Sequence, residues 1–244
     1  MRRHIRLLGA VAAAAVGVST LGACGLIPGE TSEDSATLSQ KVRSVRLDSS
    51  SGAIRLRSRQ TVTKVTVHRT VEFDGDSPKK RTYHVEDGTL VLRGCGDDCQ
   101  VSYTVDLPPR VRVSGSTSSG GISLSGVGKV DVTTHSGAVD LNDVDGAVAV
   151  RTTNGRINGR GLKGDGVRAE TSNGAIDVSL STPQDVRATA SNGAISVTAP
   201  DNRYKVSART SNGGKHIGLR DDPSGDHTLD LSTTNGSITV KKAG

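Results

Sequence analysis

Hydrophobic and polar residues alternate along most of this chain, and the alternation changes parity at recurring Ser-Gly or Asn-Gly pairs. In one stretch, Val167 and Ala169 precede the Asn-Gly pair at 173–174, and Ile176 and Val178 follow it. Alternation with a period of two predicts β-strands that bury one face. Since a straight strand would keep its parity, the chain must turn at each pair. Asn-Gly suits such a corner because both residues tolerate positive φ.

The glycine of this pair recurs at nearly constant spacing. From the second glycine onward, the intervals are 17, 18, 19, 19, 20 and 23 residues. The predicted corner glycines are Gly52, Gly120, Gly137, Gly155, Gly174, Gly193, Gly213 and Gly236. Similar units at a fixed period are typical of solenoids, in which equivalent residues stack about 4.8 Å apart. Such a ladder is expected for Asn173, Asn192, Asn212 and Asn235.

The pattern therefore predicts an all-β protein, a β-solenoid or parallel β-helix-like stack of repeats of about 19 residues. An antiparallel β-sandwich is the alternative, because Asn-Gly is also the strongest short hairpin signal. After Gly213, a two-residue insert is expected to move the inward apolar pair to Ile217 and Leu219. The regular repeats cover residues 111–242.

Residues 41–110 depart from this period and contain longer alternating segments, with turn signals at 74–75 and 87–88. They also contain three of the four aromatic residues. An open solenoid end exposes unpaired strand edges and core. We therefore expect residues 41–110 to form a β-rich section that caps one end of the stack.

The N-terminus has the features of an export signal. Basic residues at positions 2, 3 and 6 precede an apolar stretch, 7–18, which is too short to cross a ~30 Å hydrocarbon core. The following Leu-Gly-Ala-Cys24 resembles the lipobox of bacterial lipoproteins; an ordinary secretory signal with a chance cysteine is the alternative. The resemblance implies a signal peptide at 1–23 and a lipid on Cys24 that anchors the chain to the extracytoplasmic side of the cell membrane. Residues 24–40, rich in small and acidic residues, are expected to form a flexible tether.

Two further cysteines, Cys95 and Cys99, lie close together in sequence. In an exported protein, such a pair is expected to form a disulfide. A redox CxxxC centre or a metal site is the alternative, but two thiols do not complete a tetrahedral zinc site, and the nearest histidine in sequence is His84. No metal or cofactor is expected.

Candidate chemistry is sparse. Asp140, Asn158 and Asp177 should face outward on successive layers, as should Arg168 and Arg187. Stacked acids could bind a cation or act as an acid–base pair, and the arginines could bind an anion, but a solvated surface is the competing interpretation. Neither an HExxH nor a GxSxG motif occurs, and no catalytic residue is predicted.

Charge and aromatic content narrow the choice of partners. Signal cleavage would remove three of the 31 basic residues and none of the 25 acidic ones, so the net charge of +6 would fall to +3. Four aromatic residues offer few stacking platforms for nucleic-acid bases or sugars. We expect no nucleic-acid partner, and the weak positive charge is compatible with anionic wall polymers.

The entry strand VRSVRLDSSSGAIRLR, the segment VDLPPRVRVSGSTSSGGISLSGV and the repeated TSNGAIDV units resemble the DUF4097 family, also known for a suggested adhesin role. The resemblance covers residues 41–242. It implies a β-solenoid-like domain without catalytic residues that could be transferred. We therefore predict a non-catalytic, surface-anchored binding or structural module whose partner is a cell-wall polymer or a surface protein. A polysaccharide-active β-helix enzyme is the alternative.

Overall fold

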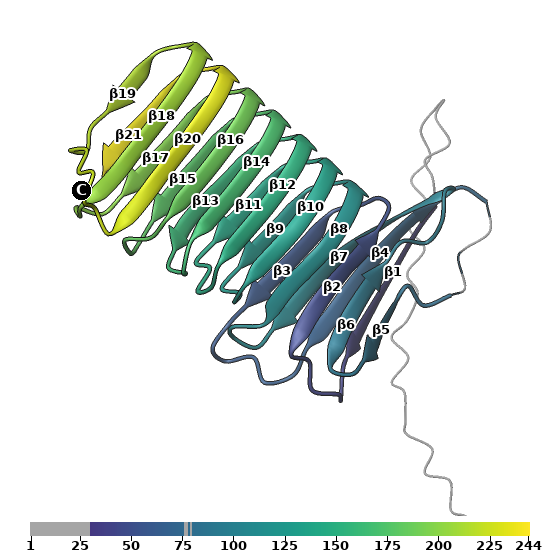
Figure 1. Ribbon diagram of the computed structural model, residues 1–244. Helices are drawn as coiled ribbons and strands as arrows, with labels where there is room; N and C mark the ends of the chain where they lie inside the picture. The colour runs from purple at the N-terminus through teal and green to yellow at the C-terminus, as the bar shows by residue number, and fades with distance from the viewer. Residues whose placement is uncertain (1–29, 76–77, 79) are drawn as a thin grey trace, which may run out of the picture.

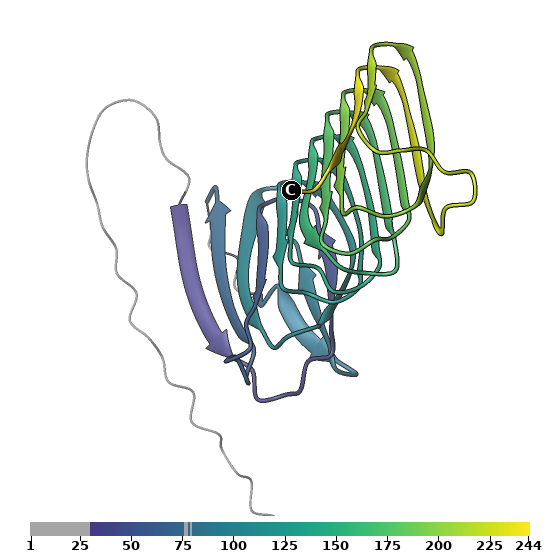
Figure 2. The same cartoon turned by 90° about the vertical axis from the view of Figure 1, so that its left-hand side faces the viewer.

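The computed structural model describes residues 30–75, 78 and 80–244, so the predicted signal peptide and Cys24 lie outside the described residues. The described chain consists of strands in two sheets, without any helix, as predicted (Figures 1 and 2). It accordingly includes no helix that is long and apolar enough to cross a membrane.

Each regular coil of the chain gives one strand to each sheet, with the predicted glycine between the two strands. The longer strands form sheet B. In spatial order, this sheet contains β18 (Tyr204–Asn212), β20 (His227–Asn235), β16 (Val186–Asn192), β14 (Val167–Asn173), β12 (Val148–Asn154), β10 (Val130–Ser136), β8 (Arg112–Ser119), β2 (Ser44–Ser49), β6 (Thr89–Arg93) and β5 (Tyr83–Glu86).

Sheet A runs alongside it in the opposite listing direction. From the N-terminal end, it contains β1 (Glu30–Thr37), β4 (Thr66–Phe73), β7 (Cys99–Leu107), β3 (Ile54–Ser58), β9 (Ile122–Ser125), β11 (Val139–Asn142), β13 (Ile157–Leu162), β15 (Ile176–Leu180), β17 (Ile195–Ala199), β21 (Ile238–Lys242) and β19 (Lys215–Ile217).

Neighbouring strands of the regular coils pair in parallel, so the solenoid prediction is confirmed and the antiparallel sandwich is wrong. The predicted change of parity is also present. In the coil of β14 and β15, Val167 and Ala169 are buried before the corner, and Ile176 and Val178 are buried after it. Repeating this pattern in every coil places aliphatic side chains between the two sheets and forms one continuous core.

The order of the coils in space differs from their order in sequence. The last coil of the chain, β20 with β21, lies between the coil of β16 and β17 and the coil of β18 with β19. The end of the stack is therefore formed by residues 204–217 and not by the C-terminal repeat (Figure 1). The expected two-residue shift is wrong as well, because Lys215 pairs with Ile238 and Ile217 pairs with Val240.

The N-terminal section closes the other end of the stack. β2 and β3 add one more parallel coil, and β6 and β7 add another beyond it. Three antiparallel pairings follow, in which β5 joins β6, β4 joins β7 and β1 joins β4. The turn predicted at 87–88 connects β5 to β6, and both of its residues have positive φ.

The predicted tether is partly wrong, since residues 30–37 form strand β1. This segment lacks an apolar pattern because an edge strand buries little: its side chains are exposed or half-buried. Polar contacts hold it instead. Asp34 accepts a hydrogen bond from Nε of Arg69 at 2.6 Å and forms an ion pair with the same guanidinium. The folded part of the chain therefore starts no later than Glu30.

Candidate functional site

The predicted corner glycines lie above one another in a single column. From Gly120 onward, a Cβ on each glycine would come closer than 3.0 Å to the carbonyl oxygen of the corner glycine in the neighbouring coil, a separation that Cβ atoms essentially never show. The column requires glycine mainly because the coils approach so closely. For Gly193 the expected positive φ is wrong, since its backbone lies outside that region, and close approach is the whole reason.

Two kinds of backbone hydrogen bond join one corner to the next. The N–H of Gly174 donates to the carbonyl oxygen of Asn192 at 2.9 Å, and the same bond recurs at Gly155, Gly193 and Gly236. A buried threonine of the following coil donates from Oγ1 to the glycine carbonyl, as Thr171 does to Gly155 at 3.0 Å. Equivalent threonine bonds come from Thr152, Thr233 and Thr210.

The asparagine side chains form the predicted ladder, but in a different order. Each amide donates from Nδ2 to Oδ1 of the next asparagine, at 2.8–3.0 Å. The sequence along the stack is Asn154, Asn173, Asn192, Asn235 and Asn212. Asn212, and not Asn235, ends the ladder.

The coil of β18 and β19 leaves the end of the core open. Val206 and Ala208 are only half-buried, whereas Leu229 and Leu231 at the same register in β20 are 0% exposed. Ile217 is 38% exposed, whereas its partner Val240 is 1% exposed. This apolar surface has no further coil to cover it among the described residues, so the C-terminal end of the stack is a candidate binding surface. We call it the open end.

Only the start of β18 is covered at its free edge. The carbonyl oxygen of Tyr204 accepts a hydrogen bond from the N–H of Asp222 at 2.8 Å, and the N–H of Val206 donates to Oδ1 of Asp221 at 2.9 Å. In a parallel strand, alternate residues direct their backbone groups to the same side. The N–H and C=O of Ala208 therefore point away from β20, and no described residue bonds to them there. The middle of β18 can thus accept another strand.

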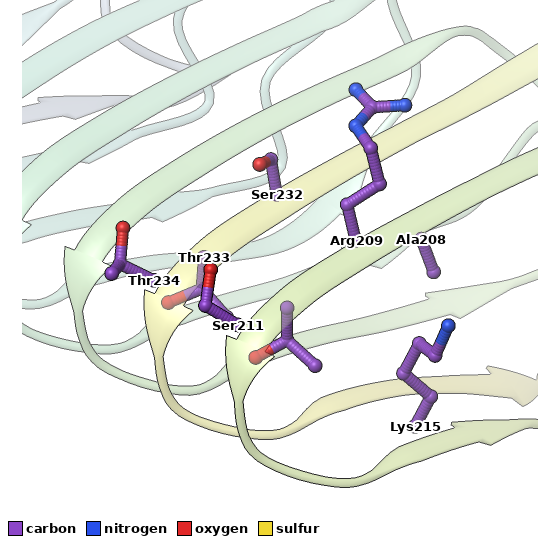
Figure 3. A pocket seen from close by; sticks show the side chains of 8 residues that line it. Ala208, Arg209, Ser211, Lys215, Ser232, Thr233 and Thr234 are labelled. Carbon is purple, nitrogen blue, oxygen red and sulfur yellow. The ribbon is translucent and has the colours of Figure 1, made fainter.

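A shallow hollow of about 290 Å³ lies on this open end (Figure 3). Hydroxyl groups of β18 and β20 line it, together with Arg209 and Lys215. Arg209 is held by Asp230, with 2.6 Å between Nη2 and Oδ1, whereas Lys215 is exposed. No acidic residue occurs between Asp201 and Asp221, so the last coil is basic.

The stacked polar residues on the outer face of sheet A meet as expected. Asp140 pairs with Asn158, and Asn158 pairs with Asp177. Nδ2 of Asn158 donates to Oδ1 of Asp140 at 3.2 Å. The two carboxylates are therefore two strand spacings apart, about 9.6 Å, with an amide between them. Among the described residues, no three His, Cys, Asp or Glu side chains are grouped as metal ligands would be.

Arg168 and Arg187 are also neighbours, but acids engage both of them. Arg168 forms an ion pair with Glu170, and Arg187 forms one with Asp230. Burial raises the pKa of Glu170, but hydrogen bonds and charge from Arg151 and Arg168 outweigh it, so the pKa of Glu170 is lowered. This surface is a network of paired charges on a sheet face and offers no unpaired cluster for an anion.

The two cysteines predicted to pair are joined in a disulfide that spans the connection from β6 to β7, with the Cα atoms of Cys95 and Cys99 5.8 Å apart. Both half-buried side chains pack against the core at the closed end. The disulfide is remote from the open end, so it contributes to the cap.

The sequence pattern of a known family, Toastrack DUF4097, matches residues 111–241, which is more than half of the chain. The chain belongs to the Toastrack DUF4097 family. The match covers the regular coils, and the N-terminal section of this Toastrack protein lies outside it. None of the curated proteins matches the sequence.

Solved structures with the same fold include a candidate adhesin of Bacteroides fragilis, with 14% identity, a TM-score of 0.50 and coverage of 88% of this chain and 97% of that one. A candidate adhesin of Parabacteroides merdae matches with 14% identity, a TM-score of 0.42 and coverage of 88% and 97%. A candidate lipid-binding protein of Parabacteroides distasonis matches with 13% identity, a TM-score of 0.40 and coverage of 89% and 99%. At these identities, the likeness concerns the fold alone.

The open end of this Toastrack protein was missed by the sequence analysis, although one signal for it existed. Every other complete corner is followed, two residues later, by an inward Ile or Val, but Gly213 is followed by Lys215 at that register. A lysine is almost never fully buried without a partner. Such a coil therefore fits only at an end of the stack.

Proposed function

We propose that this protein is a lipid-anchored, non-catalytic binding module on the outer side of the cell membrane, and that it binds a surface protein at its open end. The observation that carries the proposal is the uncovered core and free parallel edge of β18. An exposed strand edge binds an extended peptide by adding a strand to the sheet. The basic last coil favours a partner segment that carries carboxylates.

The position of the open end supports this proposal. If Cys24 bears the lipid, five residues separate it from the start of β1, and they can span at most about 18 Å. The β1 end of the stack would then stay near the membrane. β18 and β19 lie at the opposite end of the molecule (Figure 1), so the open end would be displayed away from the membrane.

The anchor is tested by metabolic labelling with palmitate. The wild-type protein should incorporate label, and Cys24→Ala should not. Label that persists in the variant would contradict the lipid anchor without bearing on the binding surface.

The binding surface is tested by photo-crosslinking on intact cells. A photoreactive amino acid at position 215, on the open end, should yield a discrete adduct, and one at position 123, on the outer face of β9, should not. Ala208→Pro removes one outward N–H from an edge strand, a change that edge strands tolerate, and should abolish the adduct while the fold is retained. Equal adducts from both positions, or an adduct unaffected by Ala208→Pro, would contradict binding at the β18 edge.

A further inference from the structure

The chain contains six Asn-Gly sequences, which are the peptide sequences most prone to spontaneous deamidation. Their asparagines are Asn154, Asn158, Asn173, Asn192, Asn212 and Asn235. In this reaction, the backbone nitrogen of the glycine attacks the side-chain carbonyl carbon Cγ of the asparagine. Glycine leaves this attack unhindered because it has no Cβ. The reaction requires the glycine N–H to be accessible and the local backbone to rotate.

The stack protects five of these sites. At four corners, the glycine N–H donates to an asparagine carbonyl oxygen of the next coil at 2.9 Å. The acceptors are Asn173 for Gly155, Asn192 for Gly174, Asn235 for Gly193 and Asn212 for Gly236. The fifth site, Asn158–Gly159, lies inside β13, between two parallel neighbours, β11 and β15. Attack at any of these sites requires a coil to open first.

Asn212–Gly213 differs because it belongs to the last coil. No coil follows it, and the N–H of Gly213 has no hydrogen-bond partner among the described residues. Asn212, Gly213 and the following Gly214 are all exposed. Asn212 uses its Nδ2 to donate to Oδ1 of Asn235, but that bond does not engage the attacking nitrogen. The corner thus combines a reactive sequence with an accessible nucleophile.

We propose that Asn212 is a site of spontaneous deamidation and isoaspartate formation in the folded protein, while the other five Asn-Gly sites are protected by the stack. The Gly213 N–Cγ bond forms and the Cγ–Nδ2 bond of Asn212 breaks. The amide proton leaves with the side-chain nitrogen as ammonia, and a succinimide results. Water then opens this ring at either carbonyl and gives aspartate or isoaspartate at position 212. The product carries a new negative charge on the basic open end, close in sequence to Lys215.

The experiment compares each site in the folded protein and in concentrated urea. The full mature protein is incubated at mildly alkaline pH, and peptide mapping by mass spectrometry follows aspartate and isoaspartate at all six positions. In urea, the six sites should react at similar rates, which removes the effect of local sequence. In the folded protein, Asn212 should keep a rate close to its urea value. The five other sites should slow at least tenfold, which corresponds to about 1.4 kcal/mol of opening free energy.

Protection of Asn212 equal to that of the inner sites would overturn the proposal, as would inner sites that react as fast as Asn212. Gly213→Val supplies a second test. Its Cβ would clash with the carbonyl oxygen of Gly236 and displace the last coil, which frees the N–H of Gly236. Deamidation should then move to Asn235, in step with faster hydrogen exchange of the Gly236 amide. Fast exchange there without deamidation of Asn235 would also overturn the proposal.

Discussion

The two ends of the stack solve the same problem differently. At the N-terminal end, the parallel coils give way to the antiparallel strands β4, β5 and β1, which cover the core and use polar contacts at the outermost edge. At the C-terminal end, the parallel coils simply stop, and the half-buried Val206 and Ala208 form the last layer. The closed end therefore protects the fold, and the open end keeps an edge available for binding.

Two buried tyrosines show the same contrast. At the closed end, the hydroxyl of Tyr103 lies 2.6 Å from both the hydroxyl of Thr82 and the carbonyl oxygen of Arg93. At the open end, Tyr204 is equally buried, but its hydroxyl has no hydrogen-bond partner among the described residues. Polar satisfaction is complete at one end and incomplete at the other, so equal substitutions should have unequal effects.

The largest difference is expected between an inner and a terminal corner glycine. Gly193→Val places a side chain against the Gly174 carbonyl with coils on both sides, and should lower the free energy of unfolding by about 3 kcal/mol. Gly213→Val meets the Gly236 carbonyl similarly, but the last coil can move outward, so its cost should be about 1 kcal/mol or less. Urea unfolding of the mature protein measures both. Equal losses would mean that the coils do not stack as closely as described.

The tyrosines give the next effect. Tyr103→Phe leaves buried polar groups of Thr82 and Arg93 without their partner and should cost about 2 kcal/mol. Tyr204→Phe removes a hydroxyl that has no partner and should change stability little or raise it slightly. Thermal unfolding of the two variants, side by side, tests this. A large loss for Tyr204→Phe would show that its hydroxyl is hydrogen-bonded in solution.

Alkaline pH should destabilise the protein partly through Tyr103. Burial raises the pKa of this phenol to about 12, although the hydrogen bond with Thr82 and the charge of Arg69 act in the opposite direction. In the unfolded chain the pKa is the ordinary 10.0, so the unfolded state loses its proton first. Stability is therefore intact below pH 10 and falls between pH 10 and 12 by roughly 1.4 kcal/mol per unit.

Tyr103→Phe is the matched control for this pH dependence. The variant should lose the part of the slope that belongs to Tyr103 and keep the part that comes from Tyr83 and Tyr204, whose pKa values burial also raises. Urea unfolding at a series of pH values gives both slopes. Identical slopes in the two proteins would mean that Tyr103 ionises normally in the folded state.

The smallest predicted effect is stabilising. Ala190 occupies the register at which Thr171 and Thr233 bond a glycine carbonyl, so the carbonyl oxygen of Gly174 lacks a threonine partner. Ala190→Thr should supply the bond and raise the free energy of unfolding by about 1 kcal/mol. Ala190→Val, which has the same shape without the hydroxyl, is the control. If valine stabilises as much as threonine, the gain comes from packing.

Much of the fold follows from local sequence. Alternation of residues such as Val167 and Ala169 identifies the strands, because a strand's side chains point to opposite faces in turn. The parity change at Asn-Gly identifies the corners. The polar strand β1 escaped notice because an edge strand buries little and needs no apolar pattern, so its acidic composition suggested a tether.

The order of the coils was decided only by the tertiary structure. All repeats present nearly the same strand edges, so pairing alone does not specify which coil lies beside which. Burial does. The repeat with Leu229, Leu231 and Ile238 gains most by lying inside the stack, whereas the repeat with Lys215 must lie at an end. The chain therefore passes back over its penultimate coil, and it is this long-range placement that makes 204–217 the open end and Asn212 its exposed corner.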